Sequence, residues 1–358
     1  MTSYSTNRRR AVLGLLSALL LVVAAYSLSS GAIPTGLWEV VARLPAVLAS
    51  LLWPHPPDQG AADQLVMVLA EIRMPRLLLG VIAGAGLAIC GALMQGLFRN
   101  PMADPGLLGV SSGAALGAVL TIVLGSAWSA RLTLPLTTWL LPVTAFGGGL
   151  VSIFIVHRLS VVGGKTDIAT MLLAGIAVNA IAGAAIGLLS YIADDVQLRS
   201  LIFWSLGSLQ ITDWRKLAVA LVVIVPALLV LPRYANALNA NLLGESEAGH
   251  LGIDMEKVKR QLIVVVALVV GILVSLSGVI GFVGLVVPHL IRILIGPDHR
   301  LLLPASALFG AALLIGADIV SRTAVAPAEI PIGIITALLG GPFFLYLLVR
   351  FHRTRSLR

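Results

Sequence analysis

One short segment carries residues that bind phosphate in many proteins. Gly163-Gly164-Lys165-Thr166 resembles the end of a phosphate-binding loop, whose full pattern is GxxxxGKS or GxxxxGKT after a strand. In that loop the backbone N–H groups and the lysine surround the phosphates. The first glycine of the pattern would stand at position 159, which is Leu159. We therefore interpret the segment as a flexible basic turn between helices, and we predict that the chain has no ATP site of its own.

Other residues that could support catalysis or metal binding are scattered. Cys90 is the single cysteine, so no disulfide can form within the chain. The six histidines have no HExxH or other paired-ligand spacing. Ser111 and Ser112 could act as nucleophiles of an intramembrane enzyme, but no paired base accompanies them. We therefore predict no catalytic residue, no metal site and no cofactor in this chain.

The composition indicates a protein that crosses a membrane several times. Of the 358 residues, 58% are hydrophobic and only 11% are charged, and the mean hydropathy is +1.02. Soluble domains carry about a quarter charged residues. Because a helix of about 20 residues crosses the hydrocarbon core of a bilayer, we expect ten transmembrane helices, near residues 11–31, 72–98, 106–125, 139–156, 168–190, 217–231, 262–277, 279–295, 301–320 and 330–350.

The domain organisation follows from these helices. Residues 11–350 form one transmembrane domain, preceded by a polar tail at 1–10 and followed by a basic tail at 351–358. With the N-terminus inside the cell, inner segments hold about two thirds of the 24 lysines and arginines. Because positive charge gathers on cytoplasmic loops, we predict that both termini are cytoplasmic. The net charge of +8 then reflects topology and does not indicate a nucleic-acid partner.

Two stretches combine tight turns with small residues at helical spacing. In the first, Arg73–Gly117, the pairs Gly80/Gly84 and Gly113/Gly117 have GxxxG spacing. Such spacing allows helix backbones to approach closely inside lipid. The second stretch, Gly278–Arg300, has a similar composition. We expect the mechanism to lie in these two stretches.

Several long motifs carry a family resemblance. In chain order they are RMPR, GALMQGLFRNPMADPGLLGVSSGA, GFVGLVVPHLIRILIGPDHRLLLP, ADIVSR and EIPIGIITALLGGPFF. Together they resemble the FecCD-type permeases, which are the membrane subunits of binding-protein-dependent ABC importers for cobalamin, haem and iron-siderophores. The resemblance covers nearly all of Arg73–Arg350.

The resemblance implies an all-α integral membrane protein with the type II ABC importer permease fold and ten transmembrane helices per subunit. It implies an inverted repeat, in which helices two to five match helices seven to ten. Corresponding helices are five positions apart in the chain. Because this number is odd, the two copies cross the membrane in opposite directions. It also implies a homodimer in a bacterial inner membrane, two ATP-binding subunits inside and a periplasmic substrate-binding protein outside.

The polar stretch Pro232–Gln261 is the candidate contact for the ATPase. It is long for a helix connection, and loops of this length are often functional. Its acidic and basic residues balance, so its composition is equally compatible with a solvated hairpin. In the resembling family this loop inserts into a groove on the ATPase, which implies coupling roles for Leu243, Gly244, Glu245, Glu247, Ala248, Gly249 and Gly252.

Three arginines lie at predicted outer ends of helices. Arg73 and Arg76 precede the second helix, and Arg322 follows the ninth. Their side chains could reach lipid headgroups, as is common at helix ends. The resemblance favours docking to acidic residues of a binding protein, with steering by charge. Asp318, four residues before Arg322, could pair with it at the membrane interface.

The proline-rich turn FRNPMADPG is a candidate gate. Its two prolines break the helix, since proline lacks an N–H and restricts the preceding residue. The turn could therefore simply end two helices. The resemblance assigns a cytoplasmic gate to Asn100, Pro101 and Met102, and a second part of the gate to Thr166, although the loop around Thr166 departs from the family's usual hydroxyl-rich run.

The fifth helix carries small residues along one stripe, which are Gly175, Asn179, Gly183 and Gly187. Such a stripe packs against another helix or lines a wide path for a large substrate. We predict pathway lining for Gly175 and Asn179, and helix packing for Gly183 and Gly187.

These observations predict the permease subunit of an ABC importer that moves a large iron chelate, haem being favoured over a ferric siderophore. ATP would be bound by the partner subunit. The alternatives are a cobalamin importer and a secondary transporter. A secondary transporter is disfavoured because the predicted helix interiors lack the acids and histidines that ion coupling requires.

Overall fold

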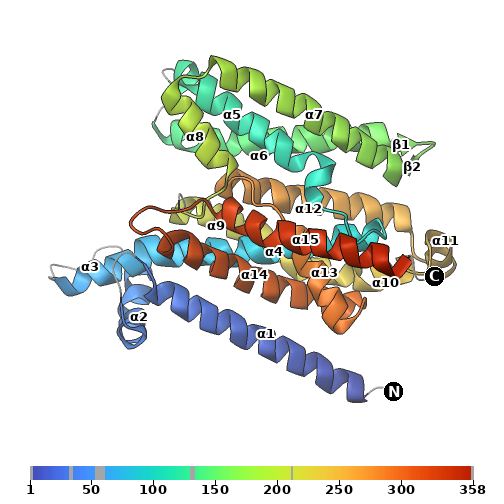
Figure 1. Ribbon diagram of the computed structural model, residues 1–358, viewed down its shortest axis with the longest axis horizontal. Coiled ribbons are helices and arrows are strands. Elements are labelled where there is room, and N and C mark those ends of the chain that lie inside the picture. Colours follow the sequence, from blue (N-terminus) through green and yellow to red (C-terminus); the bar gives the residue numbers. More distant parts are fainter. Residues whose placement is uncertain (1–2, 32–34, 53–60, 130–133, 211–212, 356–358) are drawn as a thin grey trace.

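The computed structural model describes residues 3–31, 35–52, 61–129, 134–210 and 213–355 (Figure 1). Residues 1–2 and 356–358 of the two predicted tails lie outside these ranges. The described chain is helical apart from one small hairpin. The helices are α1 (Ser3–Ser29), α2 (Leu37–Leu52), α3 (Ala61–Val68), α4 (Met74–Leu97), α5 (Val110–Ser129), α6 (Leu134–Ser160), α7 (Ile168–Ile192), α8 (Asp195–Ser205), α9 (Trp214–Val230), α10 (Ala235–Asn241), α11 (Glu245–His250), α12 (Met255–Ser277), α13 (Val283–Ile295), α14 (His299–Thr323) and α15 (Ile332–Arg355).

The hairpin consists of β1 (Val161–Val162) and β2 (Lys165–Thr166), which pair antiparallel. Its two turn residues, Gly163 and Gly164, both have positive φ, at +59° and +78°. This conformation is accessible to glycine without steric cost. The GGKT segment is therefore the turn and second strand of a hairpin, and it does not lead from a strand into a helix as a phosphate-binding loop would.

Seven described helical segments are long and apolar enough to cross a membrane. They are Arg9–Ser29, Gln64–Leu97, Thr138–Ser160, Ile168–Ile192, Trp214–Asn241, Met255–Ser277 and His299–Thr323. Three shorter helices are also apolar, at Val110–Gly125, Val283–Ile295 and Ile332–Tyr346. The chain is thus a multi-pass membrane protein, as its composition predicts.

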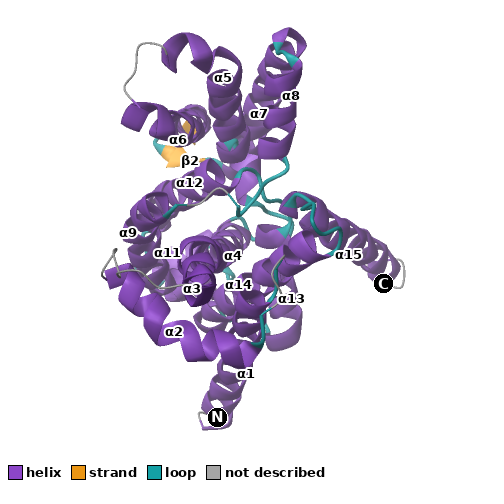
Figure 2. Ribbon diagram, turned by 90° about the vertical axis from the view of Figure 1, so that its left-hand side faces the viewer, coloured by secondary structure: helices purple, strands orange, loops and turns teal. Residues whose placement is uncertain are grey.

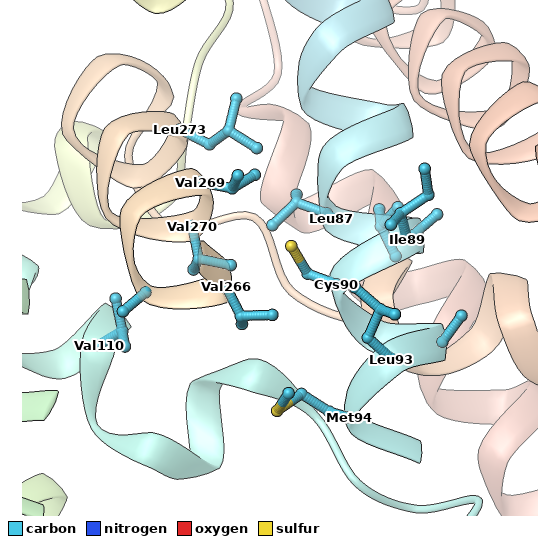
Figure 3. Close-up of a cluster of buried hydrophobic side chains, with 14 of the residues drawn as sticks. Leu87, Ile89, Cys90, Leu93, Met94, Val110, Val266, Val269, Val270 and Leu273 are labelled. Atoms are coloured by element: carbon cyan, nitrogen blue, oxygen red, sulfur yellow. The ribbon is translucent and has the colours of Figure 1, made fainter. Parts of the chain in front are cut away.

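Helix α4 is the centre of the bundle. Most of its side chains are buried, and it packs against α9, α12, α13 and α14 (Figure 2). Figure 3 shows part of this core, where Cys90 and Leu93 of α4 face Val266 and Val270 of α12. Helices α5 to α8 form a second layer, and α12 lies between that layer and the rest of the bundle (Figure 1).

Glycines determine where the helices come closest. A Cβ atom on Gly84 of α4 would overlap the backbone of Gly310 in α14, and one on Gly91 would overlap Gly284 in α13. Gly113 of α5 is opposed in the same way by Gly148 of α6. Because a side chain at these positions would separate the helices, the predicted close packing of the small-residue segments is confirmed.

Helix α1 lies along α14 and is fixed to it at both ends. Near the N-terminus, the guanidinium of Arg9 pairs with Asp298, directly before α14. At the other end, Arg322 of α14 donates to the carbonyl oxygens of Ser27 and Ser30, at 2.8 and 2.5 Å. These contacts define two ends of the bundle, which we call the Arg9 end and the Arg322 end.

The segments predicted for one side of the membrane gather at one end. The Arg9 end contains the β1–β2 hairpin, α10 and α11, and both termini point to it (Figure 1). Asn241 of α10 donates to the carbonyl oxygens of Gly96 and Leu97, at 3.0 and 3.1 Å, so the end of α4 lies there too. The segments that the distribution of lysines and arginines assigns to the cytoplasmic side therefore lie at the same end of the fold.

The starts of several helices differ from the sequence predictions. The eighth predicted helix begins at Val283 instead of Val279, because Gly278 and Phe282 adopt positive φ of +69° and +67°. The second predicted helix continues backwards through the π-helical turn Leu69–Arg73 into α3. At the N-terminus α1 begins at Ser3, so the polar residues 3–10 extend the first helix.

Candidate functional site

The first candidate surface is the connection between α9 and α12 at the Arg9 end. It contains the 3₁₀ turn Leu231–Tyr234, then α10 and α11. Gly244 and Gly252 flank α11 with positive φ of +131° and +79°, a region that favours glycine. The chain can therefore reverse sharply on both sides of α11, which packs on the end of the bundle through one face and exposes the other.

Five of the seven predicted coupling residues are exposed on this connection. Leu243 is 71% exposed and lies two residues before the acidic first turn of α11. The other four are Glu245, Glu247, Gly249 and Gly252. Gly244 is half-buried, and Ala248 is completely buried in the main core beneath α11. Ala248 thus anchors the helix, while its neighbours form an acidic and apolar outer surface.

Thr166 lies beside this connection. Its backbone N–H donates to both carboxylate oxygens of Glu256 at 3.1 Å, and its hydroxyl donates to one of them at 2.5 Å. The next residue, Asp167, caps α7 by accepting hydrogen bonds from Thr170. These hydrogen bonds, from the side chain and then the backbone of Thr170, lower the pKa of Asp167.

The predicted gate turn lies between α4 and α5. Asn100 is exposed, and its side-chain oxygen accepts from the N–H of Met102 at 2.9 Å. Pro101 and Met102 are half-buried and border a narrow crevice with His289 and Phe343 of α13 and α15. Thr166 is attached to α12, so the two predicted gate segments share one end of the bundle but contact different helices.

The stripe on α7 divides between two environments. Gly175 is buried against the carbonyl oxygen of Leu107, and the side chain of Asn179 accepts a hydrogen bond from Ser112 of α5. Both predicted pathway residues therefore face α5 and the 3₁₀ turn Pro105–Leu108 in this chain. Gly183 and Gly187 face open space, since a Cβ on either would meet nothing within 4 Å. Within the described chain they do not pack against another helix.

The three predicted docking arginines converge at the opposite end of the bundle. All three are buried. Arg76 donates through Nε to Asp318 at 2.9 Å and forms two hydrogen bonds with Glu329, at 3.0 and 2.9 Å. Arg322 lies 3.2 Å from Asp318, which confirms the ion pair suggested by their spacing.

Arg73 is bound differently from the other two arginines. Its guanidinium donates to the carbonyl oxygen of Leu28 at 2.5 Å and to Thr35 at 2.7 Å. It therefore connects the start of α4 to the end of α1. All three arginines have partners inside the chain, and their side chains are not presented to solvent in this arrangement.

A cavity of about 460 Å³ lies next to this arginine cluster. Its lining is mainly apolar, and its polar and aromatic members include Arg76, Arg199, Phe203, Trp204, Gln210 and Glu329. The guanidinium of Arg199 lies 5.7 Å above the ring of Phe203. The cavity thus places charged and aromatic side chains of α4, α8 and the segments beside them in a mainly apolar lining.

Sequence reasoning missed the partners of the predicted residues. Glu256 and Lys259 were assigned no role, although they hold the hairpin to α12. Glu256 is 90 residues away from Thr166 in the chain, and no local spacing indicates that pair. Glu329, which binds Arg76, was likewise assigned no role. Its only sequence signal was an acid near the predicted membrane surface.

The FecCD transport family matches residues 19–350 of the chain. The chain is 45% identical to the hemin transport system permease protein HmuU of Yersinia pestis, covering 97% of this chain and 98% of that protein. It is 42% identical to the cobalamin import system permease protein BtuC of Halobacterium salinarum, with 94% and 90% covered. The vitamin B12 permease BtuC of Escherichia coli is 39% identical, with 88% and 93% covered.

Solved structures share the fold. An inward-facing metal-chelate type ABC transporter is 31% identical and superposes with a TM-score of 0.78, covering 95% of this chain and 99% of its own. The PsaBC structure from Streptococcus pneumoniae is 17% identical, with a TM-score of 0.53 over 85% of this chain and 94% of its own, and supports the fold alone. The full-length agreement in sequence and the shared helical arrangement have one explanation: the chain is a member of the FecCD transport family.

Proposed function

We propose that this chain is the permease subunit of a binding-protein-dependent ABC importer that carries a large iron chelate, preferably haem, into the cytoplasm. The observation that carries the proposal is the 45% identity to a hemin permease along 97% of the chain. Two copies would form the translocation path in a bacterial inner membrane. A cobalamin importer is the second candidate, favoured by the 42% identity to a cobalamin permease.

The proposed topology has ten crossings. The seven long apolar segments and the three shorter ones make ten if each crosses the bilayer. Both termini would then be cytoplasmic, and the Arg9 end would be the inner end. The inverted repeat of helices two to five and seven to ten is part of this proposal, since an odd offset of five helices gives the two copies opposite orientations.

ATP would be bound and hydrolysed by two separate subunits. The support within this chain is α11 and the turn before it, where Glu245 and Glu247 of α11 and the preceding Leu243 are exposed at the Arg9 end. An exposed leucine bordered by acids is suited to a groove with apolar and basic walls. The chain would therefore contribute a transport path without catalytic residues, metal or cofactor of its own.

The outer end would receive a periplasmic binding protein. Arg73, Arg76 and Arg322 keep the predicted docking role only if acids of that protein replace their present partners. Arg76 is the best placed for such an exchange, because its partner Glu329 is 30% exposed. The exchange would couple docking to the positions of α1, α4 and α14, which these arginines join.

The gate and pathway assignments belong to the same proposal. Asn100, Pro101 and Met102 would close the inner end of the path, with Thr166 as a second element. Gly175 and Asn179 would line the path only if α7 turns or separates from α5, since both now face α5 and the turn before it. The open glycines Gly183 and Gly187 leave a smooth face on α7 for a second copy or a large substrate.

Reconstitution tests the proposed function. Vesicles that contain this chain with its ATPase and trapped ATP should take up haem only when the binding protein is added outside. Uptake is measured as haem retained in the vesicles, with cobalamin and a ferric siderophore as competing substrates. If the purified chain alone moves substrate along an ion gradient, the importer assignment is wrong. Preferential uptake of cobalamin would select the second candidate.

A further inference from the structure

Four polar residues join the β1–β2 hairpin to α11 through the start of α12. Thr166 donates to Glu256 through both its N–H and its hydroxyl. Lys259, three residues further along α12, donates through Nζ to both carboxylate oxygens of Glu245, at 2.8 and 2.9 Å. The same Nζ lies 3.4 Å from the carbonyl oxygen of Thr166 and 3.8 Å from Glu256. We call Thr166, Glu245, Glu256 and Lys259 the hairpin link.

Burial makes the hairpin link sensitive to the loss of any member. The side chain of Lys259 is only 6% exposed, and Thr166 is buried as well. A buried ammonium group must be paired, because leaving it uncompensated in a low-dielectric environment is strongly unfavourable. Glu245 supplies that pairing while its own side chain remains 47% exposed. The link therefore runs from the buried Thr166 of β2 to the exposed first turn of α11.

The hairpin is joined to α7 without a flexible linker. Asp167 donates through its N–H to the carbonyl oxygen of Ser160 at 2.9 Å and caps α7 through Thr170. Thr166 is thus followed at once by the first turn of α7. A displacement of Thr166 must be absorbed by the start of α7, because the closed hairpin cannot lengthen.

We propose that the hairpin link transmits the movement of α11 to α7, so that Glu256 and Lys259 are positioning residues for transport. This inference rests on the proposed function, in which an ATPase moves α11. Glu245 takes up the movement at the ATPase surface, Lys259 and Glu256 carry it across α12, and Thr166 delivers it to α7. Neither Glu256 nor Lys259 would touch the substrate.

A link that is purely structural would have different consequences. A structural role predicts that its loss lowers the amount or thermal stability of the complex, while each ATP hydrolysed still moves the same amount of substrate. A transmitting role predicts that ATP hydrolysis continues while uptake per ATP falls. The ratio of substrate imported to ATP hydrolysed therefore distinguishes the two roles.

The experiment uses the complete complex in vesicles, with haem uptake and ATP hydrolysis measured together. We expect Glu256→Ala and Lys259→Met each to lower uptake per ATP by about 5- to 20-fold, in the lower part of the range typical of coupling between sites. Thr166→Val, which keeps the side-chain volume and the backbone donor, should lower it by about 2- to 5-fold. The hydrolysis rate should stay within about twofold of that of the unmodified complex.

Three comparisons make the result specific. Lys257→Met removes a lysine from the same turn of α12, but Lys257 is exposed, so it should leave uptake per ATP unchanged. Lys259→Arg keeps the positive charge and should restore most of the coupling that Lys259→Met removes. The double variant Thr166→Val/Glu256→Ala should lose no more uptake per ATP than Glu256→Ala alone. Glu256→Ala already removes the hydrogen bond from the Thr166 hydroxyl that Thr166→Val removes.

Normal uptake per ATP in Glu256→Ala and Lys259→Met would overturn the proposal, as would an equal loss in Lys257→Met. If Glu256→Ala or Lys259→Met prevents assembly of the complex, Thr166→Val is the deciding variant. Normal uptake per ATP in Thr166→Val would then contradict the proposed role of the hairpin link. Failure of the proposed function is separate from these outcomes, since the unmodified complex would then show no ATP-driven uptake.

Discussion

Replacing Gly310 by valine is expected to separate α14 from α4 and to destabilise the protein strongly. A Cβ atom at Gly310 would overlap the carbonyl oxygen of Gly84 and the Cβ of Ala88. Backbone atoms cannot rotate away as a side chain can. Overpacking typically costs about 1–3 kcal/mol, and a backbone overlap at a helix crossing should reach at least the upper end of that range.

Gly316→Val is the matched control for this prediction. Gly316 lies on the same helix, and a Cβ there would meet nothing within 4 Å. Both substitutions therefore change helix propensity equally, and only Gly310→Val creates an overlap. Thermal unfolding of the purified protein in detergent should show a large decrease in Tm for Gly310→Val and a small one for Gly316→Val. Equal decreases would mean that the crossing of α4 and α14 does not depend on the missing side chain.

Asp318→Asn is expected to be the most damaging polar substitution. Asp318 is 3% exposed and accepts from Arg76 while it pairs with Arg322. Asparagine keeps nearly the same size but loses the charge, which leaves two buried guanidinium groups without their shared carboxylate. Breaking a buried ion pair costs about 3–5 kcal/mol when one charge remains uncompensated.

Glu329→Gln provides the comparison for Asp318→Asn. Its carboxylate also binds Arg76, but its side chain is 30% exposed, so water can replace part of the interaction. We expect a loss of about 1 kcal/mol for this variant, as for other solvent-accessible pairs. Unfolding of both variants by denaturant in the same detergent measures the difference. The proposed arginine cluster would be contradicted by an Asp318→Asn variant as stable as the unmodified protein.

The helices and their packing faces could be predicted because the lipid environment imposes simple rules on the sequence. Long apolar runs mark α1, α6 and α7, and small residues at GxxxG spacing mark the contacts of α4 and α5. Both signals lie within a single helix. Even the pair Asp318 and Arg322 could be anticipated, because residues four apart face the same side of a helix.

The contacts between distant segments could not be predicted in the same way. Arg76 and Asp318 are 242 residues apart, and nothing in the sequence around either residue indicates the other. The predicted docking role of the arginines rests on the family resemblance and on their position at helix ends, while their burial depends on how α4 and α14 pack. The late start of α13 was also missed, since Phe282 has a positive φ of +67° that its residue type does not predict.

The two ends of the bundle have different chemistry. At the Arg322 end, buried arginines connect α1, α4 and α14 around shared acids. At the Arg9 end, the hairpin link connects an exposed helix to the start of α7. In the proposed function, the first end would respond to the binding protein and the second to the ATPase, with α4 packed between them.

A single cysteine at the α10–α11 junction tests the central claim most directly. Leu243→Cys places a reactive thiol on an exposed position, while the native Cys90 is buried and should not react. A membrane-impermeant maleimide should label this variant in inverted membrane vesicles but not in spheroplasts, and the bound ATPase should protect it. Ala324→Cys, exposed near the Arg322 end, should show the opposite pattern. Labelling of Leu243→Cys in spheroplasts would contradict both the orientation and the assignment of α11 to the ATPase.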